Sequence, residues 1–205
     1  MLHVLQSEAA RVPDGVLRGM FAARKSVFVD LLRWNLPIID GRYEVDQFDN
    51  GHATYLVLTD AAGEHLASAR LLPTIRPHLL DSFYPMLCEE GPPRGDDACE
   101  ITRFCLDRRL DSRRRRAARD ALVLALVDHA VRHDIRVYSA IAELAWFQQI
   151  LAFGWRCRPL GMPSMIGGTM LAALRIDIDS NTPALLAGAG IISATPAPEQ
   201  RRAAA

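Results

Sequence analysis

The spacing of apolar residues along the chain predicts an alternation of helices and short strands. Between residues 16 and 31, apolar side chains recur every three or four positions, which predicts a helix that begins near Asp14. The strand-like runs 54–59 and 65–74 flank a short turn, so they predict a hairpin. Residues 34–51 show no clean period and contain several acids, so we expect a long ordered loop there.

The second half of the chain continues this alternation. Strands are expected at residues 3–6, 98–106, 135–139, 155–160 and 169–178, a short helix within 76–95, and longer helices from Asp111 or Ser112 onward and at 141–152. The order predicts an α/β (α+β) domain with three αβα layers, in which helices cover a mixed central sheet. We assign this domain to residues 1–180. Pro, Ala and Arg dominate residues 181–205, which predicts a weakly ordered C-terminal tail with one short helix near 184–189.

Composition narrows the class of protein without identifying it. The 205 residues contain 24 basic and 24 acidic side chains, so overall charge favours neither a nucleic-acid nor a membrane partner. No apolar run approaches the roughly 20 residues that cross a bilayer, and the N-terminus lacks the apolar core of a signal peptide. The four cysteines form no C-x-x-C pair, so we expect reduced structural thiols and a cytoplasmic location.

Several charged residues lie in apolar surroundings, where an unpaired charge would be costly. Arg24 shares the apolar face of the first predicted helix, and Arg70 alternates with apolar residues on the second strand of the hairpin. Glu44, Asp46 and Asp49 crowd into six residues of the loop and would repel one another unless cations lie near. We interpret these groups as parts of one convergent polar site. The alternatives are an arginine that reaches the surface and a solvated acidic loop.

Glu100 and Arg103 extend this set of charged residues. A regular strand would place their side chains on opposite faces, with Thr102 beside Glu100. A β-bulge near this point would direct both toward one site. Elsewhere, His129 and His133 are four residues apart, but no H-E-x-x-H motif or third ligand accompanies them, so no metal site is expected.

A run of four arginines opens the long helix that follows a predicted strand. The free N–H groups and the dipole of a helix N-terminus favour anions, and basic side chains strengthen that preference. We expect this segment, which comprises Arg113, Arg114, Arg115 and Arg116, to bind a phosphopantetheine group or an acidic carrier protein. Nucleic acid is a weaker alternative because no aromatic residues are interleaved with the arginines, and a merely solvated helix start is another.

A set of residue types in a fixed order spans most of the chain. It consists of Arg24 and Phe28 in RKSVF, Trp34, Asp46 and Asp49 in EVDQFD, Arg70 in ASARLLP, Phe83 in DSFYP, and Glu100 and Arg103 in EITRF. In these motifs, and in the later GWRCRPLGMP, the chain resembles the LuxI-type acyl-homoserine-lactone synthases (autoinducer synthases) over about residues 1–178. That family shares the fold of the GCN5-related N-acetyltransferases, so the resemblance implies an N-acetyltransferase-like fold.

The resemblance implies an acyltransferase that makes a quorum-sensing signal in two steps. The amine of S-adenosylmethionine attacks an acyl thioester on acyl carrier protein or coenzyme A, and the adduct then closes to a lactone and releases methylthioadenosine. Glu100, Thr102 and Arg103 would be catalytic, with Glu100 as a base that acts through water and Thr102 orienting the amine or the water. Substrate contacts would come from Arg24, Phe28, Trp34, Asp46, Asp49, Arg70, Phe83, Phe104, Ser139 and Trp146.

The implied roles differ among these residues. Aromatic rings at positions 28 and 34 would face the sulfonium, and the loop carboxylates would supply negative charge. The three arginines would lock those acids in place or bind the substrate carboxylate. Backbone N–H groups freed at a bulge near Phe104 would hold the developing oxyanion, and the acyl chain would pass Trp146.

No cofactor beyond the substrate S-adenosylmethionine is implied, and we expect a monomer. Thr102 departs from the serine that many family members carry, although it keeps the hydroxyl. Two alternative functions stay open. A generic acyl-CoA-dependent N-acyltransferase would usually show glycines in its phosphate loop, which RRRRAARD lacks, and a non-catalytic basic-patch binding module would leave Arg24 and Arg70 unexplained.

Overall fold

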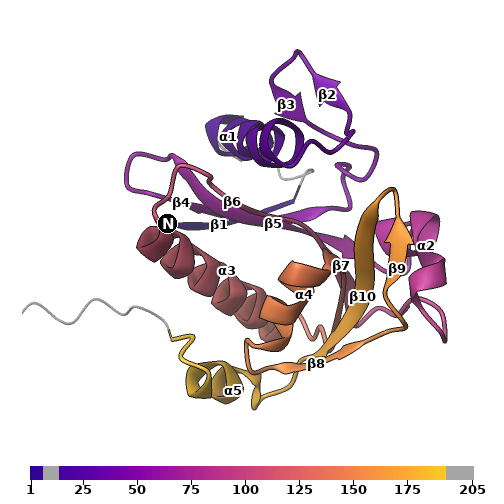
Figure 1. Cartoon of the computed structure of the whole chain (residues 1–205). Helices are drawn as coiled ribbons and strands as arrows, with labels where there is room; N and C mark the ends of the chain where they lie inside the picture. The colour runs from indigo at the N-terminus through magenta and orange to yellow at the C-terminus, as the bar shows by residue number, and fades with distance from the viewer. Residues whose placement is uncertain (7–13, 193–205) are drawn as a thin grey trace, which may run out of the picture.

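A central sheet with helices on both faces forms the body of the protein in the computed structural model (Figure 1). The structure describes residues 1–6 and 14–192. The strands of this sheet are β1 (Leu2–Gln6), β4 (Thr54–Thr59), β5 (His65–Pro73), β6 (Ala98–Leu106), β7 (Val137–Glu143), β8 (Arg156–Pro159), β9 (Ser164–Ile166) and β10 (Thr169–Asp177). They lie in the order β1-β4-β5-β6-β7-β10-β8, with β9 paired to β10.

The helices connect these strands and cover them. They are α1 (Asp14–Arg24), which continues as a π-helical segment (Lys25–Leu31), α2 (Leu79–Phe83), α3 (Ser112–Arg132), α4 (Leu144–Leu151) and α5 (Thr182–Gly188). Figure 1 shows α1 over one face of the sheet and α3 under the other. The predicted three-layer αβα architecture is therefore confirmed.

Alternation along the strands explains how one sheet serves two layers of helices. On β4, Leu56 packs with the core beneath α3, whereas Tyr55 and Val57 pack with Met20 of α1. Successive strand residues point to opposite faces, so each strand contributes apolar side chains to both layers. Arg70 lies directly opposite Tyr55 and therefore faces the α1 layer.

The sheet is mixed because one pair of neighbours, β6 and β7, runs parallel while its other pairs are antiparallel. Their register extends only from Ala98–Val137 to Ile101–Ala140, although both strands continue further. Beyond this point the two strands part. Because β6 leads directly into α3, the N-terminus of α3 lies at the end of β6 where this separation opens.

The structure differs from the predicted elements in three places. Residues 141–143 belong to β7 rather than to the following helix, because they pair with 171–173 of β10. The loop predicted at 34–51 contains a small two-stranded sheet, β2 (Ile38–Ile39) with β3 (Tyr43–Glu44). The short strand β9 was not anticipated, since three residues provide too little alternation to detect.

The short helix predicted near residues 184–189 is present as α5, but residues 182–192 are ordered where the composition predicts a weakly ordered tail. Helix α5 begins at Thr182, and Leu186 and Ile191 are buried in the main core. Their packing against that core, where α5 contacts α3, orders this segment despite its composition. Residues 193–205 lie outside the described residues. For these residues, the weakly ordered tail stays a prediction.

The four cysteines lie within or at the edge of the core, apart from one another. Cys88, Cys99, Cys105 and Cys157 are free thiols, and burial raises the pKa of Cys105 to about 12. None of the helices within residues 14–192 combines the length and apolarity that crossing a bilayer requires.

Candidate active site

Arginine and acidic side chains from four parts of the chain meet above the α1 face of β5 and β6. Arg24, at the end of α1, donates from Nε to Glu44 at 2.5 Å and from both terminal nitrogens to Asp49 at 2.8 Å. Asp49 also accepts a hydrogen bond from the Tyr55 hydroxyl at 3.0 Å. The acidic loop is thereby held against α1 and β4.

The two strands contribute the other half of this arrangement. Arg70 of β5 forms a two-pronged pair with Asp46, at 2.6 and 3.0 Å, and donates from Nε to the Thr102 hydroxyl at 2.9 Å. Arg103 of β6 donates to Glu44 at 3.0 Å and to Asp46 at 2.7 Å. We call the six residues Arg24, Arg70, Arg103, Glu44, Asp46 and Asp49 the ion cluster.

The ion cluster is buried and balanced in charge. Each of its six charged side chains is at most 6% exposed, and three positive groups face three negative ones. Burial alone would raise the pKa of Asp49, but hydrogen bonds and charge from Arg24, together with the charge of Arg70, hold it well below its usual range. The predicted convergence is therefore confirmed, and the alternatives of a surface-reaching Arg24 and a solvated acidic loop are wrong.

A β-bulge brings Arg103 into the ion cluster. Arg70 pairs with Thr102, but Ser68 pairs with Cys105, so the single residue Ala69 stands opposite both Arg103 and Phe104. Arg103 adopts a left-handed backbone with φ of 51°. The extra residue turns its side chain to the face where Arg70 and Thr102 already lie, as the bulge hypothesis required.

An aromatic pair borders the ion cluster. The rings of Phe28 and Trp34 stack with centroids 5.0 Å apart and planes 9° from parallel, and Arg103 lies over Phe28 at 5.8 Å. Phe28 belongs to the π-helical segment, and a left-handed Arg33 with φ of 62° turns the chain so that Trp34 returns onto it. Phe28 is buried, but Trp34 is 37% exposed, so a ligand can reach its ring.

Glu100 occupies a separate buried position two residues before Thr102. Its Oε2 accepts a hydrogen bond from the backbone N–H of Leu80 at 3.2 Å, while its Oε1 has no partner among the described residues. Burial raises the pKa of Glu100 to about 8, although backbone N–H groups of α2 and the charge of Arg70 oppose that rise. A carboxyl group that titrates near neutral pH suits a general base.

The other predicted site residues divide into separate groups. Phe104 of β6 and Trp146 of α4 contact each other beside the main core, with ring centroids 5.4 Å apart. Phe83 is half exposed and contacts Phe48 at 6.0 Å. Ser139 is fully buried beside Glu100 in the strand register. The structure thus brings Ser139 close to the proposed base but places it apart from Trp146, on the opposite face of the sheet.

The basic segment Arg113–Arg116 is exposed on the first turns of α3. Asp111 caps the helix by accepting from the N–H of Arg114 at 2.8 Å, and Arg115 donates to the carbonyl of Asp107. No acidic side chain within the described residues pairs with the guanidinium of Arg113, Arg114 or Arg116. These groups are free to meet an anion at the end of β6.

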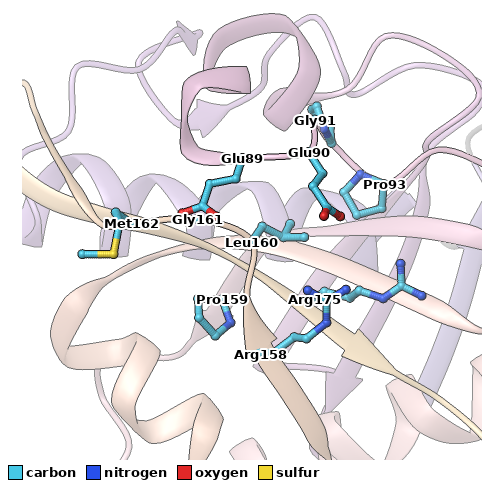
Figure 2. Close-up of a pocket in the computed structure, with 11 residues that line it drawn as sticks. Glu89, Glu90, Gly91, Pro93, Arg158, Pro159, Leu160, Gly161, Met162 and Arg175 are labelled. Atoms are coloured by element: carbon cyan, nitrogen blue, oxygen red, sulfur yellow. The ribbon is translucent and has the colours of Figure 1, made fainter.

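Two hollows in the described surface lie away from the ion cluster. One, of about 370 Å³, lies between Glu89 and Glu90 on one side and Arg158 and Arg175 on the other (Figure 2). The second, of about 500 Å³, lies beside Arg136, at the start of β7 and the end of β10. Residues 1–6 and 14–192 contain no group of His, Cys, Asp and Glu suited to a metal ion. Neither hollow contains a predicted site residue.

Sequence reasoning missed two partners of the ion cluster. Tyr55 donates to Asp49, and Phe48 lies 5.8 Å from the Arg70 guanidinium. The hairpin register would have indicated Tyr55, because it stands opposite Arg70. Nothing in the sequence pattern distinguishes Phe48 from an ordinary apolar loop residue.

Comparisons with known proteins agree on one family. The family model described as autoinducer synthase matches residues 10–185. The acyl-homoserine-lactone synthase of Ralstonia nicotianae is 34% identical over 191 residues, which cover 89% of this chain and 93% of the relative.

Solved structures extend the similarity to the fold. TofI in a ternary complex with an inhibitor and MTA has a TM-score of 0.77 at 32% identity, covering 91% of this chain and 96% of TofI. BjaI, a CoA-dependent acyl-homoserine lactone synthase solved with SAM and isopentyl-CoA, has a TM-score of 0.82 at 27% identity, covering 93% and 89%. A putative N-acetyltransferase from Lactobacillus plantarum shares the fold alone, with a TM-score of 0.58 at 14% identity, covering 87% and 99%.

Proposed function

Because the chain belongs to the autoinducer synthase family, we propose that it joins an acyl thioester to S-adenosylmethionine and releases an acyl-homoserine lactone. It is an acyltransferase of the acyl-homoserine-lactone synthase type. The observation that carries the assignment to this site is the convergence of Arg24, Arg70 and Arg103 with three carboxylates next to a buried Glu100. The site residues below are part of this proposal.

In the first step the substrate amine attacks the thioester carbonyl. Glu100 takes up the amine proton through a water molecule, and the pKa of about 8 matches this role because a free α-amine also titrates near 8. The N–C bond forms, the C–S bond breaks, and the thiolate leaves. Thr102, whose hydroxyl Arg70 orients, would align the amine or the water.

The bulge at Arg103 and Phe104 supports the same step. A bulge removes backbone N–H groups from the regular ladder, and such groups stabilise a developing oxyanion. The pairing of β6 with β7 ends just before the bulge, and Phe104 of the bulge contacts Trp146. We assign the reacting thioester to the place where the two strands part, with the acyl chain passing the two aromatic rings.

In the second step the methionyl carboxylate attacks its own γ-carbon. The C–O bond of the lactone forms as the C–S⁺ bond breaks, and methylthioadenosine leaves with the electron pair. The sulfonium is already a good leaving group, so the main task of the protein is to hold the substrate folded. The exposed face of Trp34, stacked on Phe28, offers a cation–π surface for it.

In this proposal the ion cluster is a rigid support. Its arginines are already paired with acids, which favours their role in locking the loop over direct binding of the substrate carboxylate. Asp46 and Asp49 then affect the sulfonium only through the electric field of the ion cluster, whose charges sum to zero. S-adenosylmethionine is a substrate, and no separate cofactor is required.

Product analysis tests the proposed function. Purified protein is incubated with S-adenosylmethionine and a series of straight and branched acyl-CoA and acyl-carrier-protein donors, and products are identified by mass spectrometry. We expect one acyl-homoserine lactone and an equal amount of methylthioadenosine. Acylated amines without methylthioadenosine would indicate a generic N-acyltransferase. No product, together with no thermal stabilisation by S-adenosylmethionine, would indicate a binding module.

The basic segment is proposed to hold a phosphate of the donor, which coenzyme A and a phosphopantetheine-bearing carrier both provide. The double variant Arg113→Glu with Arg116→Glu is expected to raise KM for the donor about tenfold, since two charge-assisted contacts become repulsive. KM for S-adenosylmethionine should be unchanged, and the effect should shrink at high salt.

A matched pair of substitutions controls for the change in charge. Arg132→Glu with Arg136→Glu places the same charges at the other end of α3 and just past it, where both residues are exposed. An equal rise in donor KM for both double variants would contradict a phosphate site at the start of α3. Inhibition by free coenzyme A or by carrier protein lacking an acyl group identifies which donor uses the segment.

A further inference from the structure

Two buried oxygen atoms without hydrogen-bond partners lie on adjacent strands. Glu100 of β6 stands directly beside Ser139 of β7 in the parallel register, and both residues are 0% exposed. Glu100 Oε1 and Ser139 Oγ are two of the four buried side-chain atoms that lack a partner in the described residues. The other two belong to His65 and His78. Side chains paired in this way point to the same face of a sheet, so these oxygens share one environment.

The surroundings of Ser139 explain why its hydroxyl stays unpaired. The neighbouring Tyr138 points to the other face, where its hydroxyl donates to the carbonyl of Leu126 at 3.0 Å. Arg175 of β10 flanks Ser139 on the side opposite Glu100, but its Nε donates to Asp177 at 2.7 Å. The side chain of Arg175 lines the hollow in Figure 2. No nearby group therefore satisfies the Ser139 hydroxyl.

The Glu100 carboxyl group is fixed in orientation. Its Oε2 accepts from the N–H of Leu80 in the first turn of α2, so Oε1 is the atom free to act. The charged and titratable groups around it are Arg70, Asp81 and Cys88. A buried oxygen without a partner is costly, and such atoms in folded proteins hold a water or serve in function. Here two of them occur side by side.

We propose that Ser139 is a positioning residue whose hydroxyl, together with Glu100 Oε1, holds the water molecule that carries the amine proton to Glu100. This inference rests on the proposed function. As the N–C bond forms, the amine proton passes to the water, and the water gives one of its protons to Oε1. The thiolate leaves with the electron pair of the C–S bond. Ser139 exchanges no proton in this scheme and only fixes the water.

The variant Ser139→Ala tests this inference. It should lower kcat about tenfold and leave KM for both substrates unchanged, because only the water loses its support. Without that hydrogen bond the Glu100 carboxylate is less stabilised. The low-pH limb of the plot of kcat against pH should therefore move to higher pH. The melting temperature should change little, since the Ser139 hydroxyl bonds no other protein group. Ser139→Thr keeps the hydroxyl and should restore the wild-type position of that limb.

Ser68→Ala is the matched control. Ser68 is a serine on β5 that is also buried, but its hydroxyl hydrogen-bonds His65 Nε2 at 2.9 Å. Its loss should lower stability without moving the pH limb. An active wild type with unchanged kcat and pH limb in Ser139→Ala would overturn the present inference alone. A wild type inactive with every donor would instead overturn the proposed function.

Discussion

Replacing Glu100 with glutamine is expected to lower lactone formation at least a hundredfold and to stabilise the protein at alkaline pH. The rate falls because glutamine cannot accept the amine proton, and general base catalysis contributes about 10²–10⁴-fold. The fold should persist, since the amide can still accept the hydrogen bond from Leu80. Product formation is measured by mass spectrometry under saturating substrates.

The stability change follows from the pKa of the buried carboxyl group. In the folded protein this pKa is raised from 4.5 to about 8, mainly by burial. Between these two values the unfolded chain releases a proton that the folded chain keeps, so stability falls as pH rises through this interval and levels off above it. Each tenfold difference in acidity corresponds to about 1.4 kcal/mol, so the Gln variant should gain several kcal/mol at pH above about 8 and little at pH 4.5.

Thermal unfolding at these two pH values checks the prediction. Glu90→Gln is the matched control, because Glu90 is exposed and its substitution should leave the pH dependence unchanged. Near-normal turnover in Glu100→Gln would remove Glu100 from the base role. An unchanged pH dependence of stability would show that the carboxyl group is not buried as described.

Replacing Arg70 with methionine is expected to destabilise the protein by about 3–5 kcal/mol. The substitution leaves Asp46 without its two-pronged partner and removes the 2.9 Å ion pair with Asp49. Both carboxylates remain buried, and breaking one side of a buried ion pair costs far more than losing a surface pair. Activity should fall as well, because Arg70 also holds the Thr102 hydroxyl.

Urea unfolding measures this effect. Arg132→Met is the control, since Arg132 pairs with Asp128 on the exposed surface of α3 and its loss should cost less than about 1 kcal/mol. In the double variant Arg70→Met with Asp46→Asn, the total loss should be smaller than the sum of the single losses, because one unpaired charge has been removed. A loss below 1 kcal/mol for Arg70→Met would contradict a cluster on which the loop depends.

These two predictions concern two different features of one site, the ion cluster and Glu100. The ion cluster is neutral, hydrogen-bonded throughout and buried, so it holds α1, the acidic loop and two strands in a fixed relation. Glu100 is buried without a countercharge in contact, so its proton affinity is raised into the working range. The ion cluster fixes the positions of the site residues, and Glu100 provides the base.

The sequence by itself determined the main helices and strands and the existence of the polar site. Helical and strand periods depend on side chains a few positions apart, so the hairpin, β6 and α3 were predicted within one or two residues. Arg24, Arg70 and the acidic loop were identified because charges in apolar surroundings need partners wherever they meet. The bulge at Arg103 followed from the same requirement. Residue order also carried the family resemblance.

Only the tertiary structure decided which of these groups meet and on which face. Arg103 pairs with Glu44 across 59 residues, and Ser139 lies beside Glu100 because β6 and β7 are parallel neighbours. The ordering of α5 likewise depends on the surface of α3 that it covers. Such contacts arise from strand order and register, which join residues far apart in the chain. Local sequence patterns do not specify that pairing, because it is established only when the sheet is assembled.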